Sequence, residues 1–130
     1  MGTISTTLIV FLGGGIGAAL RHLVNNVSAR LVGTEFPWGT LSINAVGSFA
    51  MGVLAGWLAF RAGEGWSQNV RLFLATGVCG GFTTFSAFSL EAVLLWESGA
   101  MGPAAAYVVA SVALAILGLV AGLALVRTMS

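Results

Sequence analysis

Four long stretches of this chain lack any charged side chain, and they limit its possible folds more than any other feature. They cover residues 1–20, 36–60, 72–90 and 99–126. Each has the roughly 18–20 residues that an α-helix needs to cross about 30 Å of hydrocarbon. The first stretch lacks the basic segment that opens a signal peptide, so we interpret it as a true membrane span. The pattern predicts an integral membrane protein with four helices.

Composition excludes the soluble alternative. Apolar residues make up 58% of the 130 residues, and only five basic and four acidic side chains are present. Soluble domains carry about 25% charged residues, and a chain this small has no core large enough for so much apolar surface. A net charge of +1 without a basic cluster also argues against a nucleic-acid partner. We expect a single all-α, four-helix transmembrane domain over residues 1–130, with membrane lipid around it.

The third span contains an internal conflict. Its run GVCGGFTT, at residues 77–84, places adjacent glycines before two β-branched threonines. Each glycine costs about 1 kcal/mol relative to alanine inside a helix. Interrupted backbone at membrane depth must be covered by protein or by a polar cavity, and its freed carbonyls can bind ions. We predict a break in this helix; a continuous helix that uses Gly77 and Gly81 for close packing is the alternative. The expected helices cover residues 4–32, 38–60, from the polar loop 61–68 to about 97, and from the link 98–103 to about 127.

The arginines give almost no preference for one orientation in the membrane. Four spans put both termini and the loop after the second helix on one side, together with Arg61, Arg71 and Arg127. The opposite side has Arg21 and Arg30. The positive-inside rule needs an imbalance, and a difference of one arginine is nearly none. The chain can therefore insert both ways round, which predicts an antiparallel dimer of two copies.

Uncharged polar side chains recur within the predicted spans. On the second helix, Thr40 and Asn44 lie one turn apart on one face. Asn44 either lines a solute path or joins two helices through a hydrogen bond, and the sequence favours neither. On the fourth helix, Tyr107 and Ser111 have the same spacing, although Tyr107 also suits an interfacial anchor.

Two phenylalanines, Phe85 and Phe88, stand about one turn apart in the third span. Such a pair commonly packs in a core or against lipid, but the positive edge of each ring can also attract a small anion. Ser89, one turn beyond Phe85, can donate the next hydrogen bond. Arg21 and Glu91 are the charged groups nearest to the span interiors, where charge usually marks function, although both can snorkel to a helix end. No set of residues suggests catalytic chemistry, so we do not expect an enzyme.

Three motifs follow one another along the chain: GGGIGAALRH at residues 13–22, FPWGTLSINAVGSFAMG at residues 36–52, and GVCGGFTTFSAFSLE at residues 77–91. They fit the patterns GGxxGAxxR, PxGTxxxNxxGSFxxG and GxxGGxTTFSxF. On these residues the chain resembles the Fluc (CrcB) family of fluoride channels along essentially its whole length. The resemblance implies a dual-topology, antiparallel homodimer with two pores. The implied function is passive, fluoride-selective export by a multi-pass protein of the bacterial cytoplasmic (inner) membrane.

The resemblance also implies roles for individual residues. Phe85 and Phe88 would meet fluoride with their ring edges, and Arg21 would draw anions toward an aqueous vestibule. The backbone carbonyls of Gly80 and Thr83 would bind a structural sodium ion at the centre of the dimer. Together with Tyr107 and Ser89, which the residue pattern alone suggests, the predicted fluoride path comprises Asn44, Phe85, Phe88, Ser111, Thr40, Tyr107, Ser89 and Arg21.

A small dual-topology, proton-coupled transporter is the main alternative. It would alternate its access and would depend on a carboxylate within the membrane, for which Glu91 is the only candidate. A scaffold subunit that transports nothing is a third interpretation. The residues by themselves do not single out fluoride, because donors and ring edges would also pass another small anion or water. Selectivity against the larger chloride ion requires a narrow path with several close donors.

Overall fold

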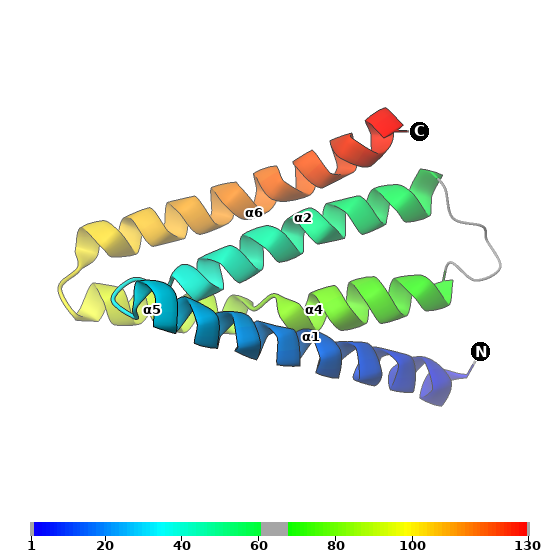
Figure 1. The fold of residues 1–130 in the computed structure, drawn as a ribbon, viewed down its shortest axis with the longest axis horizontal. Coiled ribbons are helices and arrows are strands. Elements are labelled where there is room, and N and C mark those ends of the chain that lie inside the picture. The colour runs from blue at the N-terminus through cyan, green and yellow to red at the C-terminus, as the bar shows by residue number, and fades with distance from the viewer. Residues whose placement is uncertain (1, 61–67, 130) are drawn as a thin grey trace.

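The computed structural model describes residues 2–60 and 68–129, and these residues form a bundle of four long spans (Figure 1). The first residues of α1 and the last residues of α6 lie at the same end of the bundle. The third span consists of three successive pieces, η1, α4 and α5, of which η1 is a π-helix. The helices are α1 (Thr3–Val32), α2 (Trp38–Phe60), η1 (Arg71–Cys79), α4 (Gly80–Phe82), α5 (Phe85–Glu97) and α6 (Met101–Met129).

The four predicted spans are confirmed. Four described segments are long and apolar enough to cross a membrane: Thr3–Val32, Trp38–Ala59, Gln68–Glu97 and Met101–Met129. The start of the fourth helix differs from expectation. The expected link covered residues 98–103, but α6 begins at Met101 and takes Pro103 into its first turn. Proline is tolerated there because the first amides of a helix have no partner within it. The expected polar loop at 61–67, which includes Arg61, lies outside the described residues.

The predicted break in the third span is confirmed, and it falls on the threonines rather than on the glycines. Thr83 (φ −81°, ψ 158°) and Thr84 (φ −152°, ψ 122°) have extended backbones between α4 and α5. Gly80 and Gly81 instead continue the helix. Before them, η1 runs for nine residues as a π-helix, a wide form that usually lasts for a single turn. The continuous-helix alternative is therefore wrong about the backbone.

The continuous-helix alternative also required glycines for close packing between helices, and the structure does show such packing. A Cβ atom added at Gly17 would overlap the carbonyl oxygen of Val78, and one added at Gly81 would overlap that of Gly14. A Cβ atom at Gly52 would likewise meet the backbone of α6. These helices approach one another at backbone distance, as small residues permit in membrane proteins. The glycines thus position the third span against α1 and position α2 against α6.

The buried core of a single chain is small and centres on Leu41, Phe88 and Tyr107. Many large apolar side chains are exposed instead, including Phe11 (72%) and Phe85 (77%). Lipid or another copy of the chain must cover such surface, because contiguous apolar patches of this extent are not stable in water. The homodimer and its antiparallel arrangement stay predictions, since the structure describes one chain.

Candidate functional site

The break in the third span is held by Asn44, which reaches it from α2. Asn44 Oδ1 accepts a hydrogen bond from the backbone amide of Thr84 at 2.8 Å, and Asn44 Nδ2 donates to the Thr84 carbonyl at 3.0 Å. The side chain thereby satisfies backbone groups that lipid could not satisfy. Asn44 joins two helices, and its Nδ2 keeps a second N–H that can be donated elsewhere.

Thr84 in turn caps the start of α5. Its Oγ1 accepts a hydrogen bond from the Ala87 amide at 3.2 Å and lies 3.3 Å from Ser86 Oγ. In a continuous α-helix the Thr84 amide would bind the Gly80 carbonyl. The Ala87 amide would likewise bind the carbonyl of Thr83. Because both amides bind side-chain oxygens instead, these two carbonyls lose their helical partners at the break.

A cavity of about 320 Å³ lies beside the break, and we refer to it as the break cavity. Its walls come from α2, from the break itself, from α5 and from α6. None of the described residues that line it is charged. Four members of the predicted fluoride path meet there, together with Thr83 from the predicted sodium site. The lining residues are Asn44, Ser48, Thr83, Thr84, Phe85, Phe88, Ser111, Val112, Ala115 and Ile116.

Ser111 lines the break cavity, and its side chain makes no hydrogen bond to any described residue. It is only 6% exposed, and its Oγ has no hydrogen-bond partner among the described residues. A buried hydroxyl without a partner costs about 1–3 kcal/mol, so proteins rarely leave one in place. Ser111 therefore contributes a buried hydroxyl, unpaired among the described residues, to the wall of the break cavity.

Phe85 and Phe88 both line the break cavity, but they differ in how far they are exposed. Phe88 is buried at 8% exposure, whereas Phe85 is exposed. Their ring centroids lie 5.5 Å apart, with the planes inclined at 47°. One wall of the cavity is therefore a tilted aromatic pair whose outer ring is left uncovered by this chain.

Two further residues of the predicted path lie away from the break cavity. Tyr107 is fully buried behind Phe88, with ring centroids 5.2 Å apart. Its hydroxyl donates to Glu91 Oε1 at 3.3 Å, so it serves the core of the chain and does not anchor it at the membrane surface. Thr40 is buried and lines a second cavity.

Ser89 and Arg21 line neither of these two cavities. Ser89 is exposed on α5 and donates to the Phe85 carbonyl of its own helix at 2.9 Å. Arg21 is half-buried on α1. The geometry of one chain does not bring them to the break, and their roles stay predictions.

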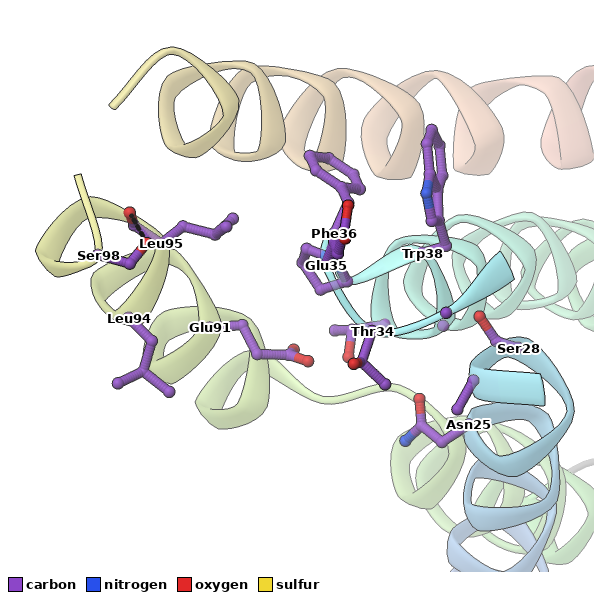
Figure 2. A pocket seen from close by; sticks show the side chains of 15 residues that line it. Asn25, Ser28, Thr34, Glu35, Phe36, Trp38, Glu91, Leu94, Leu95 and Ser98 are labelled. Carbon is purple, nitrogen blue, oxygen red and sulfur yellow. Dashed lines mark hydrogen bonds between the residues drawn. The ribbon is translucent and has the colours of Figure 1, made fainter. Parts of the chain in front are cut away.

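The second cavity, which we call the vestibule cavity, measures about 360 Å³ and lies between the end of α1, the start of α2 and α5 (Figure 2). Figure 2 shows the Glu91 side chain pointing from α5 toward Thr34 and Asn25 across this space. Glu35 also lines it. The sequence pattern missed this cavity, although a polar segment between two spans was a signal for it.

Residues 8–123 match the model of the family described as CrcB-like protein, Camphor Resistance (CrcB). The chain belongs to this family. Among its CrcB-like relatives, the "Fluoride-specific ion channel FluC" of Rhodopseudomonas palustris (strain BisB5) is 61% identical over 125 residues, which cover 96% of this chain and 99% of the relative. The "Fluoride-specific ion channel FluC 2" of Nitrobacter hamburgensis is 58% identical over 92% of this chain and 95% of the relative.

Membership in the CrcB-like family confirms the resemblance drawn from the three motifs. It also agrees with the four apolar spans, so the protein is a multi-pass bacterial membrane protein. A third relative, from Mesorhizobium japonicum, is 57% identical over 94% of this chain and 96% of the relative, and it is also named a fluoride-specific ion channel. The names of these relatives describe channels and not enzymes.

Proposed function

We propose that this protein is a fluoride-selective channel that lets fluoride leave the cell passively across the cytoplasmic membrane. Three relatives that are 57–61% identical to it are named fluoride-specific ion channels. The observation within this chain that most supports the proposal is the break cavity. It has an aromatic wall and no charged side chain among the described residues, and one of its lining residues, Ser111, has a buried hydroxyl without a partner among them.

The lining of the break cavity suits a small anion of high charge density. Such an ion must exchange its water for several close donors, and the Ser111 hydroxyl and the second N–H of Asn44 are two of them. The edges of the Phe85 and Phe88 rings carry partial positive charge and add weak attraction. Because no arginine or lysine among the described residues lines this space, the ion is not bound so tightly that it cannot leave.

A second copy of the chain would complete the pathway. Phe85 is 77% exposed, so the break cavity lacks an outer wall in a single chain. An antiparallel homodimer would cover this face twice and would create two pores. The near-equal arginine counts on the two sides of the membrane, which allow insertion both ways round, support the same arrangement.

The break also suits a structural sodium ion at the dimer centre. Sodium prefers oxygen ligands, and the carbonyls of Gly80 and Thr83 have lost their helical partners because the amides of Thr84 and Ala87 bind side chains. Among the described residues, no three His, Cys, Asp or Glu side chains gather to hold a metal ion. The ion would therefore rest on backbone oxygens, as in other interrupted membrane helices.

Fluoride efflux from liposomes tests the function. Purified protein is reconstituted with fluoride inside, and release is followed with a fluoride electrode beside a matched chloride experiment. We expect rapid fluoride release and little chloride release, without a requirement for a proton gradient. A proton-coupled transporter, which the comparisons do not support, would instead require that gradient. Release of neither ion by folded, dimeric protein would contradict the proposal.

A further inference from the structure

Five aromatic rings form a continuous series of contacts from the connection between α1 and α2 to the break cavity. Phe36 and Trp38 begin it at the vestibule cavity, which both residues line. Phe85 and Phe88 end it at the break cavity. The ring centroids along the series are separated by 4.6 Å (Trp38 to Phe36), 5.5 Å (Phe36 to Tyr107), 5.2 Å (Tyr107 to Phe88) and 5.5 Å (Phe88 to Phe85).

Tyr107 is the central ring of this series, and it is fixed from three directions. Phe36 meets it edge-on, with an interplanar angle of 85°. Phe88 packs against it at 49°. Its hydroxyl donates to Glu91 Oε1 at 3.3 Å, and its side chain is 0% exposed. A ring enclosed in this way has little freedom to turn, because close-packed neighbours occupy the space that it would need.

The fixed position of Tyr107 determines how Phe88 faces the break cavity. Phe88 is 8% exposed and lines that cavity on one side, while Tyr107 packs against its other side. Phe85 is 77% exposed and contacts Phe88 at 5.5 Å, so its inner support comes from the same ring. Any change that frees Tyr107 therefore loosens the aromatic wall of the cavity.

Phe36 reaches Tyr107 from a connection whose backbone is constrained. The residue before a proline is restricted to extended conformations, and Pro37 imposes this restriction on Phe36. The Phe36 carbonyl also accepts a hydrogen bond from the Trp38 amide at 2.8 Å, which closes a tight turn. The backbone of Phe36, and with it the direction of its Cα–Cβ bond, is thus restricted locally.

We infer that Phe36 is a positioning residue of the channel, which holds Tyr107 against Phe88 and so keeps the aromatic wall of the break cavity in place. This inference rests on the proposed function. It assigns to the connection between α1 and α2, which lies outside the spans, a part in setting the conductance and selectivity of a cavity formed by the spans.

The test compares three variants in the liposome efflux assay. Phe36→Leu removes the ring, and we expect fluoride flux to fall by about fivefold, the factor that corresponds to the loss of one aromatic pair. Phe36→Tyr keeps the ring, so we expect it to retain most of the flux. Phe11→Leu makes the same change at an exposed phenylalanine on α1 and serves as the control. Phe36→Met carries the same expectation as Phe36→Leu if the leucine variant does not fold.

A double-mutant cycle with Phe88→Leu separates positioning from a general loss of structure. If Phe36 acts through Phe88, adding Phe36→Leu to Phe88→Leu should reduce flux little further. Independent losses that multiply, or equal flux in the wild type and Phe36→Leu, would overturn the inference while leaving the proposed function intact. A Phe36→Tyr variant as poor as Phe36→Leu would also overturn it. A wild-type protein without fluoride flux would overturn both.

Discussion

The break cavity and the vestibule cavity are alike in size, at about 320 and 360 Å³, but they differ in charge. The vestibule cavity is lined by the carboxyl groups of Glu35 and Glu91, whereas no charged residue among those described lines the break cavity. Two charges 4 Å apart interact by about 1 kcal/mol in bulk water and by about 4 kcal/mol near a protein surface. An anion would therefore meet like charge in the vestibule cavity but only uncharged side chains, among those described, in the break cavity.

Asn44→Ala should have the largest effect, because it removes both the support of the break and a donor of its cavity. We expect fluoride flux to fall by about 100-fold, and the free energy of unfolding to fall by about 2–4 kcal/mol, since the Thr84 amide and carbonyl both lose their partner. Efflux and thermal unfolding measure the two effects. Asn26→Ala, at an exposed position on α1 where the amide contacts His22, is the matched control. Wild-type flux in Asn44→Ala would contradict this role.

Ser111→Ala should separate function from stability. The variant loses a donor to the ion, so we expect flux to fall by about 30-fold, within the range for a hydrogen bond to a charged group. The folded protein should be as stable as the wild type or slightly more stable, because a buried hydroxyl without a partner is removed. The control Thr7→Ala changes an exposed hydroxyl on α1. Reduced stability with unchanged flux would show that Ser111 serves packing alone.

Phe85→Ala and Phe88→Ala should differ in stability more than in flux. We expect each to lower fluoride flux by about tenfold, because each ring lines the cavity. Only Phe88→Ala should lose about 3–5 kcal/mol of unfolding free energy, since Phe88 is 8% exposed and Phe85 is 77% exposed. If both variants keep wild-type flux and selectivity, the rings are packing and not part of the ion path.

Glu91→Gln should have the smallest effect on fluoride flux, because it changes the vestibule cavity and not the break cavity. Glutamine keeps the oxygen that accepts the Tyr107 hydroxyl and removes only the charge. Because Glu91 lines the vestibule cavity and not the break cavity, we expect fluoride flux to stay within about threefold of the wild type. Loss of all flux in this variant, together with a requirement for a proton gradient in the wild type, would favour the proton-coupled transporter.

The sequence predicted the four spans and the third-helix break because lipid imposes simple rules of length and backbone satisfaction. It also indicated Asn44, Phe85, Phe88 and Ser111, which the structure brings to one cavity. The break was expected within residues 77–84, and it lies at Thr83 and Thr84, where Asn44 from another helix binds the backbone of Thr84. A contact between residues 40 positions apart leaves no local pattern in the sequence.

The surroundings of Tyr107 are a second feature that the sequence could not predict. Its spacing from Ser111 suggested a shared face on the ion path, yet the two side chains have different surroundings. Ser111 lines the break cavity, whereas Tyr107 is enclosed by Phe36, Phe88 and Glu91. Helical spacing gives the direction of a side chain, but the depth at which a neighbouring ring covers it depends on packing from other helices.

Current recorded across a planar lipid bilayer is the measurement that shows whether the uncharged break cavity passes fluoride and excludes chloride. With fluoride on one side, an equal concentration of chloride on the other and the same pH on both, the reversal potential reports which anion permeates. We expect a steady current that reverses far from zero, in the direction set by the fluoride gradient. A reversal potential near zero, or no current from correctly assembled protein, would contradict it.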